Sequence, residues 1–420
     1  YLTKEQMLEN PRQSTNPDDR AGNRLYTANL TVSSEFGESS RAAVSFLYGR
    51  KNNDFDFTTT YWNSFVDSTI DTFGVTPSGA LDFTVFGRKD RLLVGADYYT
   101  DKLSVRRFAE IERTTETMSA TVEKSTIGAY LHNELGLTES LALGAGGRIE
   151  QATIGGEMSS GGSLVFDDDT THNASAANVS LTYNFRDKSK LFAKFGTTYR
   201  YPFVDEQVSY YGFGGDQVLT NLTEEAGTDL QLGGEIAISP GLKAGLTLFQ
   251  MKLRDEIAYN PATWRNENLD KTQRRGAEAA VAWKPCAYFE FAGNYTFARA
   301  EFDGGANDGK DIPLVPRQTA SVSATFVLPR GFAIRLGARH TGEATLGGDY
   351  ANAGSRLSAY TLADIMLRYA PENMEGFDAF IAVDNVFDKQ YASVGYWDGM
   401  QEAYYPSAGR AFRIGASYRF

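Results

Sequence analysis

Apolar and polar residues alternate along most of this chain. In the closing residues 409–420, Phe412 and Ile414 stand on one parity and Arg413 and Arg419 on the other. Successive side chains of a strand point to opposite faces, so this pattern predicts a strand with one apolar and one polar face. The same alternation recurs in residues 177–185, 228–238 and 319–328. We therefore expect an all-β protein.

The predicted strands are long, and their connections are of two kinds. They run to about ten residues or more, and a tilted strand that crosses a bilayer needs about 9–11. Long polar segments rich in Gly and aromatic residues join alternate strand ends, and we interpret them as loops. Short polar turns join the other ends, at residues 36–41, 88–91, 137–140, 186–190, 239–241, 284–287, 328–331 and 370–376. Short turns at one end and long loops at the other are typical of transmembrane β-barrels.

Two soluble architectures are the alternatives to a membrane barrel. A propeller would place four short strands in each repeat, whereas each period here holds two long ones. A soluble sandwich would not need aromatic residues at its strand ends. Tyr183, Phe185, Phe326 and Phe412 lie near such ends, as expected for an aromatic girdle at a membrane interface. An outer-membrane barrel with a polar lumen is therefore the preferred interpretation.

The strand count predicts a transmembrane antiparallel up-and-down β-barrel that is only partly present. The pattern indicates about seventeen strands, starting around Leu25–Phe36, whereas closed bacterial barrels have an even number. With the short turns on the periplasmic side, residues 1–21 form the remnant of an extracellular loop and residues 22–420 the C-terminal portion of the barrel. One further upstream strand would give about eighteen, and five would give about twenty-two. We expect the truncation at Tyr1 and the natural end at Phe420.

The composition argues against several other classes of protein. No apolar run approaches the roughly 18 residues that a membrane helix needs. The 53 acidic against 41 basic residues argue against a nucleic-acid groove. Cys286 is the only cysteine, and His132, His172 and His340 show no metal-ligand spacing. Without a nucleophile–His–acid set, a phosphate cradle or a metal cluster, we expect no enzyme, no cofactor and no resident metal.

Three stretches resemble one family, the TonB-dependent outer-membrane receptors. The most specific is AVDNVFDKQY, residues 382–391, which is similar to the family's penultimate-strand signature. The strand GRAFRIGASYRF follows it and ends at Phe420. The matching positions of the signature are Val383, Asn385, Phe387, Asp388 and Tyr391.

The other two stretches carry Pro and acidic residues at strand entries. One runs from TTYRYPFVDEQ to NLTEEAGTDLQLGGEI, and the other is GKDIPLVPRQTASVSATF, with Gln318 where the family commonly has His. Asn and Asp favour turns, and Pro is tolerated at the first residue of a strand. We therefore expect these motif residues to be structural. They fall on Arg200, Pro202, Asp205, Glu206, Asn221, Leu222, Glu224, Glu225, Glu235 and Pro316.

The resemblance implies a fold and a set of partners. It implies a barrel of about 22 strands whose N-terminal plug domain and TonB-interacting segment are absent from this sequence. It implies active uptake driven by the TonB–ExbB–ExbD complex through that missing part, and recognition of the strand ending at Phe420 by the barrel-assembly machinery. The other expected partners are outer-membrane lipid, lipopolysaccharide and a small-molecule chelate, with no nucleic acid. We expect a monomer.

The long loops are the expected ligand-binding surface, because a plugged barrel must capture its ligand outside first. Aromatic faces suit planar aromatic chelates and sugar rings, and Arg200 would attract an anionic chelate. The family's most frequent role makes a ferric siderophore the expected ligand, with cobalamin, another metal chelate or an oligosaccharide as alternatives. The candidate residues are Tyr199, Arg200, Tyr201, Phe203, Tyr210, Tyr211, Phe213, Tyr396, Trp397, Tyr404, Tyr405, Tyr61 and Trp62.

Other functional classes stay open at this point. A passive porin of about eighteen strands and a surface-exposed adhesive β protein are both compatible with the alternation. Two acidic segments, residues 167–169 and 303–311, are candidates for Ca²⁺, although neither has the oxygen spacing of an EF-hand loop. Solvated acidic loops are the preferred interpretation of both.

Overall fold

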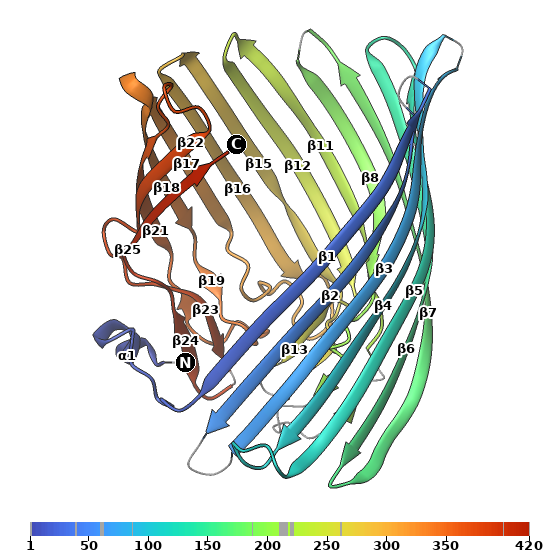
Figure 1. Cartoon of the computed structure of the whole chain (residues 1–420), viewed down its shortest axis with the longest axis vertical. Coiled ribbons are helices and arrows are strands. Elements are labelled where there is room, and N and C mark those ends of the chain that lie inside the picture. The colour runs from blue at the N-terminus through green and yellow to red at the C-terminus, as the bar shows by residue number, and fades with distance from the viewer. Residues whose placement is uncertain are drawn as a thin grey trace.

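One antiparallel sheet of 17 strands makes up most of the molecule (Figure 1). The computed structural model describes residues 2–37, 40–58, 63–85, 87–186, 188–209, 217–218, 222–260, 263–397 and 399–419. The strands of this sheet are β1 (Arg20–Phe36), β2 (Ser40–Thr58), β3 (Asn63–Val85), β4 (Arg88–Phe108), β5 (Glu116–Gly136), β6 (Leu141–Ser160), β7 (Ser163–Asn184), β8 (Lys190–Arg200), β11 (Glu225–Ser239), β12 (Leu242–Arg254), β15 (Thr272–Cys286), β16 (Phe289–Phe302), β17 (Gln318–Val327), β18 (Phe332–Thr341), β21 (Tyr360–Tyr369), β22 (Phe377–Asp384) and β25 (Ala411–Tyr418).

The remaining elements are small and lie in the connections. A helix, α1 (Lys4–Glu9), precedes the first strand, and a short 3₁₀ helix, η1 (Pro329–Gly331), lies between β17 and β18. Four two-stranded hairpins fold from the longer connections: β9 (Val208–Ser209) with β10 (Gln217–Val218), β13 (Ile257–Asn260) with β14 (Arg265–Asn268), β19 (Ala344–Thr345) with β20 (Arg356–Leu357), and β23 (Ala392–Trp397) with β24 (Glu402–Pro406).

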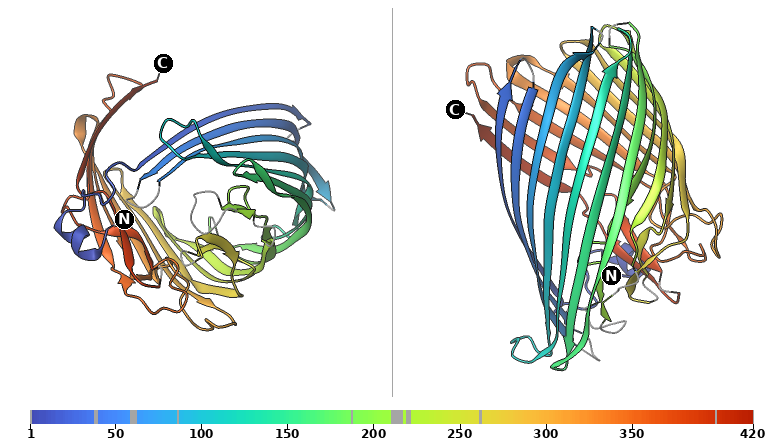
Figure 2. Two further views of the ribbon diagram at one scale, coloured as in Figure 1. Left: turned by 90° about the horizontal axis from the view of Figure 1, so that it is seen from below. Right: turned by 90° about the vertical axis from the view of Figure 1, so that its right-hand side faces the viewer.

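Each strand of the large sheet pairs antiparallel with the next, in chain order. Where a hairpin intervenes, the strand before it pairs with the strand after it, as β8 does with β11 and β22 with β25. Within the described residues no ladder joins β1 to β25, so these two strands are the edges. Seen from below, the sheet curls into an incomplete ring (Figure 2). The predicted up-and-down topology with about seventeen strands is thereby confirmed.

The register separates an outer from an inner face. Leu30 lies opposite Phe46 on one face of β1 and β2, and both side chains are exposed. Thr31 lies opposite Ser45 on the other face, with the two hydroxyl oxygens 2.9 Å apart. The short strands β9 and β10 lie inside the ring (Figure 2), and their residues pack against this second face, which is therefore the inner one.

The strands β2 to β7 are longer than the sequence suggested. They contain 19 to 23 residues each, and only short connections join them at the end where long loops were expected. The interpretation of long loops is therefore wrong for this side of the barrel and right for the connections after β8. Strand pairing uses backbone N–H and C=O groups. These strands therefore continue through segments that contain few apolar side chains.

Some turn and loop positions also need correction. The turn expected at residues 88–91 lies before Arg88, where β4 begins opposite Val85. Strand β15 extends to Cys286, so the turn expected at residues 284–287 starts later. The first strand begins at Arg20, ahead of the expected Leu25.

The acidic segment at residues 167–169 is part of β7 and is not a loop. Successive side chains of a strand point to opposite faces, so its three carboxylates cannot converge on one ion. Across the described ranges no group of three or more His, Cys, Asp or Glu is placed to hold a metal ion. The Ca²⁺ alternative is therefore wrong for this segment.

Most large apolar side chains of the sheet are exposed on its outer face. They include Ile127 and Leu131 on β5 and Leu230, Leu232 and Ile236 on β11. A continuous apolar surface of this extent normally marks contact with a partner or a membrane. In the described part of the chain, no helix has the length and apolar character needed to span a membrane.

Candidate functional site

The folded connections gather at one end of the barrel, which we call the loop end. The hairpins β13–β14, β19–β20 and β23–β24 lie there, at the bottom of Figure 1, while the short turns lie at the opposite end. Strands β2 to β7 form a tall wall on one side of this mouth (Figure 2). Short strands with long connections, from β16 onward, form the other side.

The inner face of the tall wall becomes apolar near the loop end. Leu103, Val122 and Met158 are almost fully buried there, and Val204 and Val208 of the connection after β8 pack onto them. Sequence reasoning missed this cluster. A signal was available, because apolar residues in 118–122 occupy the parity that carries polar residues farther along β5. The cluster fixes the connection after β8 against the barrel wall.

Ion pairs hold the same connection at its base. The Arg200 guanidinium donates to Glu206 at 2.7 Å and to Glu225 at 2.5 Å. The next hairpin adds a further link, because the Asn266 side-chain amide donates to the Glu206 carbonyl at 3.0 Å. Pro202 is fully buried. Arg200, Pro202 and Glu206, all carried over from the family motif, therefore anchor the loop.

Two tyrosines that sequence analysis offered as ligand contacts are bonded to the inner wall. The Tyr199 hydroxyl donates to Glu150 at 2.7 Å and accepts from Arg148 at 3.0 Å. The Tyr201 hydroxyl donates to the backbone carbonyl of Glu150 at 2.8 Å. Burial, followed by the nearby Glu150 and Glu224 carboxylates, raises the pKa of Tyr201 to about 12. Both rings are thus engaged within the protein.

Phe203 differs from these tyrosines because the residue is 52% exposed. The Arg200 guanidinium carbon lies 4.8 Å from the ring centroid, and the Lys124 ammonium lies 5.4 Å from it. Lys124 is only 8% exposed and sits 3.3 Å from Asp101 on the inner wall. The structure therefore combines an accessible aromatic ring with two cations at the mouth, which we call the Phe203 site.

The aromatic residues near the C-terminus form a second, separate group. Tyr404 is buried among Leu2, Leu346 and Leu357, and its hydroxyl donates to Glu402 at 2.8 Å. Trp397 packs partly buried against the same cluster. Tyr396 and Tyr405 lie on the paired strands β23 and β24, with ring centroids 5.9 Å apart in an edge-on arrangement. The candidates Tyr61, Trp62, Tyr210, Tyr211 and Phe213 lie outside the described residues.

Asp311 links two of the long connections. Its carboxylate accepts from Arg317 at 2.8 Å and from Arg356 at 2.7 Å, while Asn352 bonds its backbone on both sides. Burial acts to raise the pKa of Asp311, but the two guanidinium groups outweigh it and hold the pKa below its ordinary value. Asp311 is thus committed to two arginines, and residues 303–311 contain no group of three carboxylates placed to hold a metal ion, which argues against the Ca²⁺ alternative for this segment.

The family-signature residues form a turn after β22. Asn385 has a φ of 50° and exchanges two hydrogen bonds of 2.9 Å with the backbone of Lys389. Asp388 has a φ of 53° and accepts from the Arg410 backbone at 2.8 Å. Asn and Asp tolerate this left-handed region better than most residues. Both residues therefore shape the turn that leads into the last hairpin.

The other motif residues are spread over the molecule. Phe387 is exposed, and the Tyr391 ring lies 4.4 Å from that of Tyr360. Glu235 pairs with Lys190 at 3.0 Å on the inner face, and Pro316 is half-buried. Asn221 and Phe420 lie outside the described residues.

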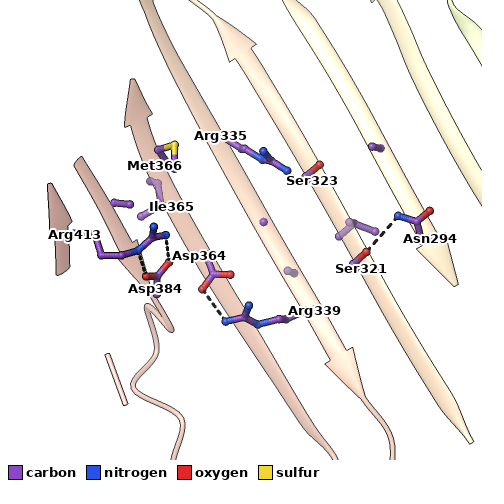
Figure 3. Close-up of a pocket in the computed structure, with 15 residues that line it drawn as sticks. Asn294, Ser321, Ser323, Arg335, Arg339, Asp364, Ile365, Met366, Asp384 and Arg413 are labelled. Carbon is purple, nitrogen blue, oxygen red and sulfur yellow. Dashed lines mark hydrogen bonds and ion pairs between the residues drawn. The ribbon is translucent and has the colours of Figure 1, made fainter. Parts of the chain in front are cut away.

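A cavity of about 450 Å³ lies along strands β16 to β25 (Figure 3). Charged pairs stand among the residues that line it: Arg413 is bonded to Asp384 at 2.5 and 2.8 Å, and Arg339 lies 3.8 Å from Asp364. Arg335 lines the same surface and forms no ion pair with any described residue. These residues belong to the inner parity, so the lumen wall is polar and charged as predicted.

Comparison with known proteins defines the class. The model of the family "TonB dependent receptor-like, beta-barrel" matches residues 4–386, and the chain belongs to this family. No curated protein sequence matches the chain.

Solved structures share the fold at low sequence identity. The closed form of the ferric-catecholate import receptor Fiu from E. coli K12 is 15% identical with a TM-score of 0.78, over 96% of this chain and 65% of Fiu. The ferric yersiniabactin uptake receptor FyuA from Yersinia pestis is 18% identical with a TM-score of 0.78, over 97% and 63%. The unliganded ferric citrate transporter FecA is 15% identical with a TM-score of 0.81, over 100% and 65%. The chain thus spans slightly less than two thirds of each.

Proposed function

We propose that the whole protein takes up a ferric siderophore across the bacterial outer membrane by TonB-dependent active transport. Membership of the receptor family supports the transport class. The observation that carries the ligand is the Phe203 site, where one exposed ring lies within 5.4 Å of two cations. An iron chelate with aromatic arms offers a ring that can stack on the exposed Phe203 ring.

The printed names of the structural relatives agree with this ligand class. Fiu, FyuA and FecA are described as receptors or transporters of ferric chelates. Cobalamin, another metal chelate and an oligosaccharide remain the alternative ligands. Family membership argues against the passive porin and the adhesive protein.

The energy source and the membrane location that we propose rest on the same family membership. The polar, charged inner wall suits a water-filled or plugged lumen, and the exposed apolar outer face suits lipid. We place the protein in the outer membrane as a monomer inserted by the barrel-assembly machinery, with TonB–ExbB–ExbD acting through a plug outside this sequence. The loop end then faces the exterior, where ligand is captured.

Growth and binding experiments test this function. A strain lacking the gene should lose growth on a ferric catecholate as the sole iron source under iron limitation, and the full-length gene should restore it. The purified full-length receptor should bind the ferric catecholate, whereas cyanocobalamin and maltooligosaccharides should not compete. Normal growth of the deletion strain, or binding of cobalamin or sugar in place of the chelate, would refute the proposal.

A further inference from the structure

A short segment ahead of the first strand lies against the last hairpin of the chain. It comprises residues 2–10, which include the helix α1, and we call it the strap (Figure 1). Leu2 forms an isolated antiparallel bridge with Tyr404 of β24, in which each backbone N–H donates to the other residue's carbonyl, at 2.9 and 2.8 Å. The strap therefore joins the segment before β1 to the hairpin β23–β24.

Two apolar side chains fasten the strap to this hairpin. Leu2 is 3% exposed, and Met7 of α1 is 7% exposed. Both belong to one buried cluster with Tyr404 and with the hairpin β19–β20. Leu8, the next residue of the same helix, is 55% exposed. The strap is therefore held by one narrow apolar face and one backbone bridge.

The strap has little stability of its own. Helix α1 contains six residues, and isolated helices shorter than about 12–15 residues are marginal in water. A capping box between Thr3 and Gln6 supports its first turn, with hydrogen bonds of 2.9 and 3.3 Å. Because local bonds alone do not hold so short a helix, α1 depends on its contact with the hairpin.

An exposed tether joins the strap to the barrel wall. Among the described residues, the hydrogen bonds of residues 11–18 stay within residues 6–19. The next contact with the barrel is made by Asp19, which accepts from the Thr58 backbone at 2.7 Å and from its hydroxyl at 3.1 Å. The strap can thus leave the hairpin without breaking a strand.

The hairpin that the strap holds belongs to a larger folded unit at the loop end. The Gly347 N–H donates to the Gly395 carbonyl at 2.9 Å, and the Gly347 carbonyl accepts from the Trp397 backbone at 2.8 Å. The Ser355 backbone donates to the Glu402 carboxylate at 2.9 Å. These bonds join β23–β24 to the connection between β18 and β21. The strap therefore bears on both connections through a single hairpin.

We propose that the strap is releasable: when docked it folds α1 and holds the hairpin β23–β24 in place, and when undocked it loses α1 and frees the hairpin to move. Release breaks one bridge and exposes two apolar side chains, whereas continuous ladders hold the strands. Segments with few buried apolar contacts open at lower free energy than core strands. The hairpin carries Tyr396, Trp397 and Tyr405. If the proposed function holds, a docked strap slows the escape of a captured ligand.

Hydrogen exchange of the ligand-free, full-length receptor in detergent tests the strap itself. In Met7→Asp a carboxylate replaces a buried side chain, so the amides of residues 2–10 and 392–406 should exchange at least tenfold faster than in the parent protein. Leu8→Asp adds the same charge at an exposed position of the same helix and should exchange like the parent. Unchanged exchange of β5 in both variants shows that the barrel is folded.

A disulfide tests release in the opposite direction. Antiparallel residues that exchange both hydrogen bonds have Cα atoms about 5.5 Å apart, within the usual range for a disulfide. In a Cys286→Ser background, oxidised Leu2→Cys/Tyr404→Cys should exchange at residues 392–406 at least fivefold more slowly than the same protein after reduction. Bound ferric dihydroxybenzoylserine should also dissociate at least fivefold more slowly from the oxidised form, and reduction should restore the faster rate.

Several results would overturn the releasable strap. They are equal exchange in Met7→Asp and Leu8→Asp, equal exchange in the oxidised and reduced forms, or exchange of residues 2–10 in the parent protein as slow as that of β5. Equal dissociation of the chelate from the oxidised and reduced forms would refute the effect on ligand escape. The outcome is separable from the proposed function, because exchange is measured without ligand. Failure of the parent protein to bind the chelate would count against the proposed function alone.

Discussion

Single side chains at the loop end fall into two groups. Tyr199, Tyr201 and Tyr404 are tied up by hydrogen bonds and burial, so their aromatic character serves the protein's own packing. Phe203 keeps an exposed ring beside Arg200 and Lys124. The aromatic residues that are available to a ligand are therefore those that the fold leaves exposed.

The substitution Phe203→Ala should weaken binding of a ferric catecholate about tenfold, equivalent to about 1.4 kcal/mol. The ring is lost, while Arg200 keeps its carboxylates and the loop keeps its anchor. Titration of the purified full-length receptor, followed by intrinsic fluorescence, measures the change. Tyr288→Ala, an exposed aromatic residue in the turn between β15 and β16, should bind like the parent. Unchanged binding by Phe203→Ala would show that the ligand does not bind at the Phe203 site.

Asp311→Asn should destabilise the two connections that its carboxylate joins, by about 2 kcal/mol at neutral pH. Asp311→Asn can be compared with Asp308→Asn, an exposed residue of the same connection, which should have little effect. Hydrogen exchange of residues 342–359 in both variants reports the local stability. Equal exchange in the two would show that the paired arginines contribute nothing measurable.

The pKa of Asp311 sets the pH dependence of this effect. Because the folded-state pKa is depressed, the stability it contributes is present above the ordinary carboxyl value of about 4 and is lost as pH falls through the folded pKa. The difference in exchange between the parent and Asp311→Asn should therefore shrink as pH is lowered below about 4. A difference that grows on acidification would contradict this assignment.

At the scale of elements, the tall wall of β2 to β7 and the connection after β8 act as one unit. Val204 and Val208 cover the apolar inner face, and Arg200 closes the base. Strand parity distinguishes this apolar cluster from the apolar outer surface. Its residues occupy the same inner-face parity as the polar residues farther along the same strands. The cluster positions the Phe203 site on a rigid support.

Leu103→Ala should loosen this unit, because a buried leucine removed from a packed cluster costs about 2–5 kcal/mol. Leu103 is fully buried, so the expected result is faster protease cleavage within residues 201–209 of the otherwise folded receptor. Leu131→Ala on the outer face of β5 removes the same side-chain volume from an exposed position and should leave cleavage unchanged. Equal cleavage rates would show that the connection is held by its ion pairs alone.

At the scale of the whole molecule, the sheet divides space into two environments. Its outer face is apolar around most of the ring, and its inner face carries paired charges such as Arg413 with Asp384. A bilayer tolerates charged side chains on the lipid side poorly at its midplane, whereas a wet lumen accepts them. The two faces thus require different surroundings.

Spin labels at neighbouring positions of β11 test this division. After replacement of Cys286 by Ser, a nitroxide is attached at Ile236→Cys or at Glu235→Cys in membrane-reconstituted full-length receptor. The label at position 236 should be accessible to oxygen and the label at 235 to an aqueous nickel chelate, because the two side chains point to opposite faces. The reverse pattern would contradict the assignment of the outer and inner faces.

The sequence by itself determined the alternation, the strand count and the family. Alternation is local, because side chains at i and i+2 share a face whatever their partners are. Residues 382–391 likewise carried their turn signal in their own Asn and Asp. These features needed no knowledge of distant contacts.

Only the tertiary structure decided where strands end and which aromatic residues remain exposed. Polar residues extend β7 because the backbone of β6 pairs with them, which their composition does not reveal. Tyr201 and Phe203 are two residues apart and equally aromatic, yet one is bonded to Glu150 and the other half-exposed. The placement of Arg275 opposite Arg299 likewise depends on register, because only the pairing of β15 with β16 brings these two residues together. Each of these outcomes is a contact between residues distant in the chain.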